Sequence, residues 1–173
     1  FGGLRLDPES LLPIQRAVYV YQAYGRLEQC RRDRHRRRAH GGAAQSVEEK
    51  DEQLDAARRA VADLAAAARG RSLQVHALVA QAELKRLEGN PTGALEAALA
   101  AAGPIRAASS ALAEYEAARV RARALQELGD PGAARRAARD AIDLATEHGW
   151  PHRSDWVRLE FELAGESPVG TYD

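Results

Sequence analysis

Two arginines and a glutamine recur about one helical turn apart in the second half of this sequence, at Arg119, Arg123 and Gln126. Residues three or four positions apart lie on the same face of a helix. Two guanidinium groups on one face can donate paired hydrogen bonds to the carboxylates of a bound partner. In the alternative interpretation, Glu116 neutralises Arg119 and Arg123, and the face is simply solvated. The spacing therefore indicates either a face that binds carboxylates or a charged surface helix.

A run of arginines forms the densest block of charge in the chain, and such blocks can bind nucleic-acid phosphates or an acidic protein surface. The run lacks the interleaved aromatic side chains of a single-strand binding surface. It also lacks apolar residues that could pack. We favour a frayed helix end followed by a linker near residues 31–46, with nucleic-acid binding as the alternative. The residues that would bind an anion are Arg31, Arg32, Arg34, Arg36, Arg37 and Arg38.

Motifs for catalysis are missing from the sequence. Cys30 is the only cysteine, no serine lies in a Gly-x-Ser-x-Gly turn, and no glycine-rich phosphate-binding loop is present. His148 and His152 flank Pro151, which breaks helical spacing, and no clear third ligand completes a metal site. We expect no enzymatic activity, no cofactor and no metal ion.

The composition predicts the fold class. Hydrophobic residues make up 45% of the 173 residues but aromatic ones only 5%, and alanine is the most frequent apolar residue. Alanine favours helices and lets them approach closely, and no convincing run alternates as a strand would. No apolar run approaches the roughly 20 residues of a membrane span. We predict one all-α domain, without a membrane span and without an internal disulfide, in a reducing compartment such as the cytoplasm.

Capping and stop signals place the helices. A first helix begins after Ser10 and its buried part ends near Cys30, and helices capped by Ser46 and Ser72 follow, ending near Gly70 and Gly89. Further helices begin at Asn90, at Asp130 and at Ser154. The helix between the first two of these begins either at Pro104 or at a cap by Ser109 or Ser110, and we favour the later start. They end before Gly103, Gly129, Gly149 and Gly165, and residues 165–173 form a loose tail.

An internal repeat is the strongest signal in the chain. The motif Gly89-Asn90-Pro91-Thr92-Gly93-Ala94 recurs 40 positions later as Gly129-Asp130-Pro131-Gly132-Ala133-Ala134. A fixed period that contains two helices indicates stacked helix pairs. At the same offset alanines match alanines, which predicts where the paired helices touch: Ala82 with Ala122, Ala97 with Ala137, Ala98 with Ala138 and Ala101 with Ala141.

This pattern resembles the tetratricopeptide repeat over residues 72–148. The matching features are the small residue midway along the first helix of each pair, the Gly-Asn or Gly-Asp turn and the alanines of the second helix. The period exceeds the family's roughly 34 residues, the aromatic positions are mostly alanine, and the first helix pair does not follow the pattern. The resemblance implies a right-handed α-solenoid of about three antiparallel helix pairs and a C-terminal capping helix over residues 1–164. It is similar to the longer-helix repeats of large bacterial signalling and regulatory proteins.

The resemblance also implies a function. In the family, the first helices of successive pairs line a concave groove that binds a protein or peptide. The corresponding residues here are His76, Glu83, Arg86, Glu116, Arg119, Arg123 and Gln126. We therefore expect a protein-binding scaffold within a larger signalling or transcription-regulating protein. Nucleic-acid contact through the basic run, or a structural array that positions another domain and self-associates, are the alternatives.

Aromatic residues offer two further expectations. Tyr19, Tyr21 and Tyr24 form a cluster on the first predicted helix and cannot all face one core, so some of them are available for an interface or a further repeat. Trp150 and Trp156 are expected to close the open end of the stack.

Overall fold

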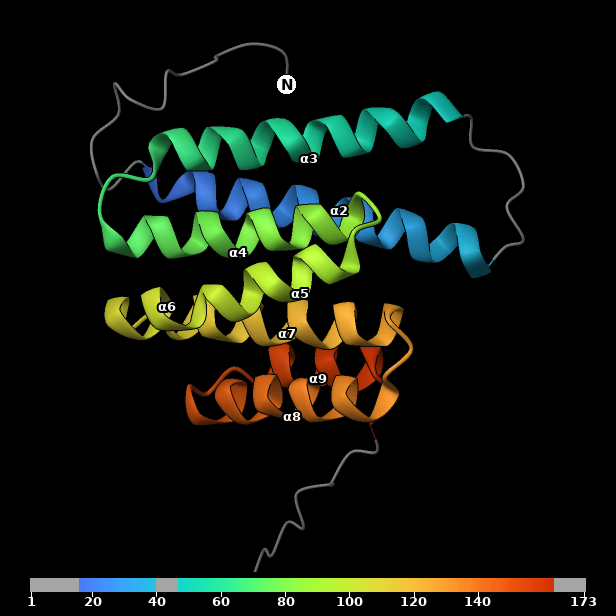
Figure 1. Cartoon of the computed structure of the whole chain (residues 1–173), viewed down its shortest axis with the longest axis vertical. Helices are drawn as coiled ribbons and strands as arrows, with labels where there is room; N and C mark the ends of the chain where they lie inside the picture. The colour runs from blue at the N-terminus through green and yellow to red at the C-terminus, as the bar shows by residue number, and fades with distance from the viewer. Residues whose placement is uncertain (1–15, 40–46, 164–173) are drawn as a thin grey trace, which may run out of the picture.

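The computed structural model describes residues 16–39 and 47–163 as an all-α structure (Figure 1). The described residues contain no strand. The predicted fold class of packed helix pairs is therefore confirmed. The helices are α2 (Val18–Ala39), α3 (Val47–Ala67), α4 (Arg71–Leu87), α5 (Pro91–Ala100), α6 (Ala102–Ala108), α7 (Ala111–Glu127), α8 (Pro131–Glu147) and α9 (Pro151–Glu160).

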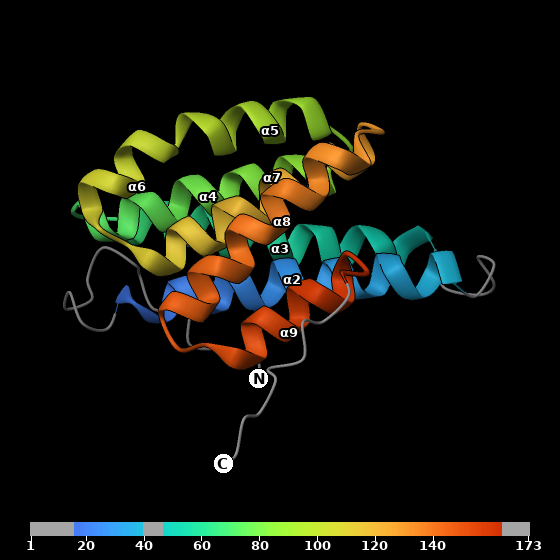
Figure 2. The same ribbon diagram turned by 90° about the horizontal axis from the view of Figure 1, so that it is seen from below.

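The helices stack as successive pairs along the chain. Helix α2 packs on α3, α4 packs on α5 and α6, and α7 packs on α8. The last helix, α9, packs on α8. The second pair contacts the first through α2 and α3 and contacts the third through α7. The first pair, which does not follow the repeat in sequence, thus packs in the same order as the others. Figure 2 shows α5 on one side of α4 and α7, with α2 and α9 on the opposite side.

The two turns of the sequence repeat have the same local structure. The side chain of Asn90 accepts a hydrogen bond from the Gly93 amide at 2.8 Å, and that of Asp130 accepts one from the Ala133 amide at 2.8 Å. Gly89, just before Asn90, has a φ of 88°, which glycine adopts without a steric cost. Both predicted caps are therefore confirmed, and each is followed by a proline in the first turn.

The start of α7 also follows the prediction. The hydroxyl of Ser110 accepts a hydrogen bond from the Ala113 amide at 3.4 Å, whereas Ser109 ends the preceding helix with a left-handed backbone at φ 50°. Between α5 and α7 lies a separate short helix, α6, whereas the sequence indicated Pro104 only as an alternative start of the next helix. Gly103 and Pro104 lie inside α6, because a proline near the start of a helix removes only a hydrogen bond that has no helical partner.

Two predicted caps are wrong. Helix α4 begins at Arg71, before Ser72, because Gly70 makes the sharp turn from α3 with a φ of 88°. Helix α9 begins at Pro151, whose fixed φ already suits a first helical position. Ser154 is buried inside α9 and accepts a hydrogen bond from Arg158 at 2.6 Å. The cap predicted at Ser46 and the tail lie outside the described residues.

The core of the stack is made largely of alanine. Each residue of the pairs Ala82 with Ala122, Ala98 with Ala138 and Ala101 with Ala141 is at most 2% exposed. These small side chains let the helices of a pair approach closely. In the fourth predicted pair Ala137 is 7% exposed and Ala97 is only partly buried, so the predicted contact positions are buried except at Ala97. Larger residues such as Tyr115 and Ile105 fill the remaining space between helices.

The basic run is helical, which corrects the prediction that the helix frays after Cys30. Helix α2 continues to Ala39. Arg31 and Arg32 both donate hydrogen bonds to Glu28 one turn earlier, and Arg34 donates to the Leu87 carbonyl. Arginine is a good helix former, and these contacts replace the missing apolar packing. Residues 40–46 of the predicted linker lie outside the described residues.

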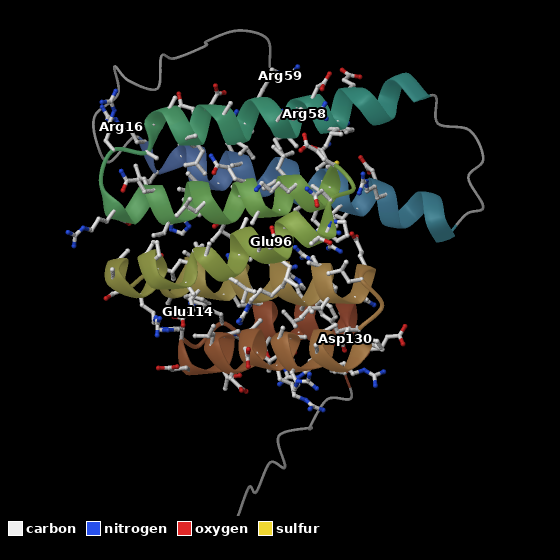
Figure 3. All side chains as sticks on the ribbon, in the orientation of Figure 1. Arg16, Arg58, Arg59, Glu96, Glu114 and Asp130 are labelled. Atoms are coloured by element: carbon white, nitrogen blue, oxygen red, sulfur yellow. The ribbon has the colours of Figure 1, made fainter. Side chains whose placement is uncertain are left out.

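The outer surface carries the usual exposed charges. Arg58, Arg59, Glu96 and Glu114, labelled in Figure 3, are exposed, and Arg58 forms ion pairs with Asp55 and Glu88. Such pairs contribute little because water screens them. None of the described helices has the length and apolar character needed to cross a membrane.

Candidate functional site

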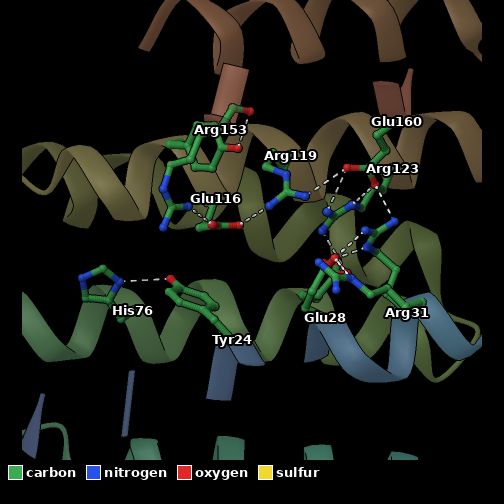
Figure 4. A network of polar contacts seen from close by, with 12 residues as sticks. Tyr24, Glu28, Arg31, His76, Glu116, Arg119, Arg123, Arg153 and Glu160 are labelled. Carbon is green, nitrogen blue, oxygen red and sulfur yellow. Dashed lines mark hydrogen bonds and ion pairs between the residues drawn. The ribbon is translucent and has the colours of Figure 1, made fainter. Parts of the chain in front are cut away.

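A network of buried charges lies where α2, α4, α7 and α9 face one another (Figure 4). The side chains of this network come from four helices far apart in the sequence. Five of the seven residues predicted to line a groove belong to it, and they are at most 9% exposed: Glu83, Arg86, Glu116, Arg119 and Arg123. Ions this deeply buried must be paired, so the contacts of each one matter.

Glu83 on α4 joins the second helix pair to the third. Its carboxylate accepts two hydrogen bonds from Arg86 on the same helix, at 2.9 and 2.7 Å. It also accepts one from Arg123 on α7 at 3.1 Å. Arg86 in turn reaches Glu127 at the end of α7. Two ion pairs thus cross from α4 to α7 in addition to the apolar contacts of the two helices.

Glu160, the last residue of α9, is the most heavily used carboxylate. Arg123 donates to both of its oxygens, at 2.6 and 3.1 Å, and Arg119 donates to Oε2 at 3.0 Å. Arg31 of α2 forms an ion pair with Oε1 at 3.3 Å. One carboxylate therefore holds three guanidinium groups and links α9 to α7 and to α2.

A second cluster lies beside the first. Glu116 accepts from Arg119 at 3.3 Å and from Arg153 of α9 at 2.9 Å. The guanidinium carbons of Arg119 and Arg153 lie 5.5 and 5.1 Å from the centroid of the Tyr115 ring, and the Tyr115 hydroxyl donates to the Arg153 carbonyl at 3.0 Å. Cation–π contacts help to hold arginines in a dry environment. Arg119 Nε has no hydrogen-bond partner among the described residues.

At the other end of the network the contacts are between uncharged side chains. Tyr24 of α2 places its hydroxyl 3.0 Å from His76 Nδ1, and Ser110 places its hydroxyl 3.3 Å from His76 Nε2. A neutral imidazole offers one donor and one acceptor, which matches two hydroxyl partners. Burial lowers the pKa of His76, against the opposing effect of Glu116. His76 therefore joins α2, α4 and α7 in its uncharged form.

Electrostatic balance sets the ionisation of the network. Burial alone raises the pKa of Glu28, but hydrogen bonding and attraction from Arg31, with the charges of Arg123 and Arg119, lower it from its usual 4.5 to about 2. The same competition places the pKa of Glu160 well below its ordinary value, because burial is outweighed chiefly by Arg123. Both carboxylates are ionised at neutral pH, so the arginines remain paired.

One side of the network opens into a cleft of about 1120 Å³. Two apolar side chains of α9 stand at its edge, Trp156 at 50% and Leu159 at 79% exposure. Six arginines and four glutamates line it, and three of these arginines also pair with Glu83 or Glu116, which do not line the cleft. The charged and polar lining is Glu28, Arg31, Arg32, Arg34, Arg86, Arg119, Arg123, Gln126, Glu127, Glu160 and Glu162.

The cleft unites residues that the sequence assigned to two separate hypotheses. Arg86, Arg119, Arg123 and Gln126 of the predicted groove line it, together with the first three arginines of the basic run. Gln126 is exposed, whereas Arg119 and Arg123 are 5% and 7% exposed. The solvated helix face considered for these two arginines is therefore wrong. Arg36, Arg37 and Arg38 lie on α2, and their side chains are outside the described residues.

The remaining predicted residues lie away from the cleft. His76 and Glu116 belong to the neutral end and the middle of the network. Of the predicted tyrosine cluster, Tyr19 is buried, Tyr24 contacts His76, and Tyr21 is 69% exposed on α2. Trp150 packs edge-on against Tyr115, with ring centroids 6.1 Å apart.

Sequence reasoning missed several residues of the network. Glu28 lies three and four positions before Arg31 and Arg32, a spacing that could have identified it as their partner. Glu160 and Arg153 gave no such signal, because their partners on α7 are more than 30 positions away. They meet only because the stack brings α9 and α2 to the same side of α4 and α7.

Comparison with known proteins does not add a family to this description. No family model matches the chain, and the comparisons with curated proteins and with solved structures also found no match.

Proposed function

We propose that this chain is a protein- or peptide-binding scaffold, built from tetratricopeptide-like repeats and forming part of a larger cytoplasmic signalling or regulatory protein. Its binding site is the arginine-lined cleft. The proposal rests on one observation above others: arginines from α2, α4 and α7 line a single cleft whose edge exposes Trp156 and Leu159. Exposed aromatic residues beside arginines are typical of protein interfaces.

The resemblance to the repeat family supports the same site. The helices that line the cleft include α4 and α7, the first helices of two successive pairs, which carry the family's groove. The network beneath the cleft holds these helices at fixed positions, and a preformed surface loses less entropy when a partner binds. The mechanism is passive docking, with no chemical step.

The test compares a cleft variant with a matched control in an affinity capture from nuclease-treated native lysate. The cleft variant carries Arg32→Glu and Leu159→Ser, and both side chains are well exposed, so the fold should persist. The control carries Arg139→Glu and Leu99→Ser on the outer helices α8 and α5, where the original side chains are also exposed. Circular dichroism confirms the folding of both.

We expect a protein captured by the wild type and the control to be lost from the cleft variant, and the purified protein to bind again in isolation. Equal capture by both variants would remove the cleft from the proposal. Recovery of nuclease-sensitive material alone would favour the alternative of nucleic-acid contact through the basic run. If nothing is captured by any variant, the array is structural and only positions other domains.

A further inference from the structure

We infer that the cleft takes an acidic peptide segment with a neighbouring apolar residue, and that a carboxylate of this segment displaces Glu160 from its arginines. The inference rests on the proposed function and specifies the chemistry of its partner. Glu160 then acts as an internal substitute for the partner's carboxylate, present whenever the cleft is empty of peptide.

Glu160 occupies a position in the cleft at which a ligand carboxylate could replace it. Its carboxylate receives hydrogen bonds from Arg119 and Arg123 and an ion pair from Arg31, and it also lines the cleft. The side chain is 13% exposed, whereas Arg119 and Arg123 are 7% and 8% exposed. Glu160 is therefore more exposed than the two arginines that it pairs with, and an incoming carboxylate can reach it from the cleft.

The buried arginines that Glu160 neutralises must stay paired. A buried arginine without a partner is strongly unfavourable, so a ligand that merely removed Glu160 would destabilise the protein. Exchange of one carboxylate for another keeps Arg119 and Arg123 paired throughout. Two of the Arg123 nitrogens already form the paired arrangement that guanidinium offers to any carboxylate. The site is thus organised before the ligand arrives.

Two exposed apolar side chains at the edge of the cleft favour a peptide as its ligand. Trp156 and Leu159 lie on α9 three positions apart, on the same side as Glu160, and both line the cleft. A ligand carboxylate at the Glu160 position would place its neighbouring residues over these two side chains. An apolar residue there would remove exposed hydrophobic surface from water. This selects a peptide over a small inorganic anion.

The charges of the cleft favour a peptide over nucleic acid. The lining arginines attract negative charge, but Glu127 and Glu162 are also in the lining. A densely charged phosphate backbone would lie close to these carboxylates and be repelled. An acidic peptide can place its few charges at the arginines and its apolar residue elsewhere, as complementary protein surfaces do.

The test measures binding of a fluorescent peptide that alternates glutamate and leucine, with a peptide of glutamine and leucine as the uncharged probe. Glu160→Gln weakens the internal competitor, so we expect it to bind the acidic peptide about tenfold more tightly than the wild type. Glu162→Gln is the matched control, because it removes one negative charge from the same lining and forms no ion pair within the described residues. It should tighten binding only slightly.

A second measurement uses the wild-type network. In a Trp150→Phe variant, Trp156 is the only tryptophan, and its fluorescence reports directly on the edge of the cleft. The acidic peptide should shift this emission to shorter wavelength and protect it from iodide, whereas the glutamine peptide should not. This result does not depend on whether Glu160→Gln folds.

The outcomes separate the two proposals. If both peptides bind equally, or if Glu162→Gln tightens binding as much as Glu160→Gln, exchange at Glu160 is wrong while the scaffold function stands. Tighter binding of single-stranded DNA than of the acidic peptide would also overturn the choice of ligand. If the lysate partner is retained by the cleft variant, the cleft is not the binding site of the scaffold, and exchange at Glu160 is wrong for that partner.

Discussion

The two sequence repeats, α4 with α5 and α6 and α7 with α8, agree in their turns and differ on the face that they share. Asn90 and Asp130 cap their helices in the same way, and Ala82 and Ala122 are both fully buried. On the inner face the same offset of 40 positions pairs Glu83 with Arg123. These two residues carry opposite charges and bond to each other. The comparison teaches that the repeat determines the stacking, while the differences between repeats determine the network and the cleft.

The largest expected effect comes from removing the charged pair by which the two repeats differ, Glu83 and Arg123. Arg123→Met removes one hydrogen bond from the buried Glu83 and two from Glu160, so we expect the free energy of unfolding to fall by about 3–5 kcal/mol. Arg121→Met is the control, because Arg121 pairs with the exposed Asp140 and its loss should cost less than about 1 kcal/mol. Urea unfolding followed by circular dichroism measures both. Similar losses for the two variants would contradict a structural role of the network.

A smaller effect is expected at the positions where both repeats have a buried alanine. Ala82→Leu and Ala122→Leu each add a side chain to a closely packed contact, so we expect each to destabilise the protein by about 1–3 kcal/mol. The two losses should be similar because the positions are equivalent. Ala100→Leu, at an exposed position of α5, should change stability by no more than about 0.5 kcal/mol. Thermal unfolding measures all three, and a large loss at only one repeat would show that the equivalence does not extend to packing.

The smallest expected effect concerns the uncharged end of the network, at His76. Glu116 is the equivalent position in the next repeat. The pKa of His76 is lowered in the folded protein, so the unfolded chain takes up a proton first as the pH falls. Stability is complete above about pH 6.5 and declines below it, with a slope of at most about 1.4 kcal/mol per pH unit. His76→Gln should abolish this dependence.

Urea titrations between neutral pH and about pH 5 measure the slope for the wild type and for His76→Gln. The carboxylates do not interfere, because the pKa of Glu28 is lowered to about 2 and its contribution is lost only as the pH falls below its usual 4.5. A slope that is the same in both proteins would show that another group is responsible.

The fold could be predicted from the sequence because its signals are local. The caps at Asn90, Ser110 and Asp130 each need only a few residues, and alanine spacing identified the contact positions. The predicted caps at Ser72 and Ser154 were wrong where Gly70 and Pro151 gave stronger local constraints. The helical basic run was missed because part of its stabilisation comes from α4, through the Leu87 carbonyl, and from α9, through Glu160.

Local signals in the amino-acid sequence are enough to predict the repeat, the buried alanines and the described helices other than α6, because each depends on backbone preferences and on periods of a few residues. The sequence also marked the arginines of α2 and α7 as unusual. Only the tertiary structure decided what these arginines do. The stack brings α2 and α9 together over α4 and α7, so Glu160 and Glu28 neutralise charges far away in the sequence, and Trp156 comes to lie beside them. Contacts of this kind depend on how whole helices are placed, and no local pattern encodes them.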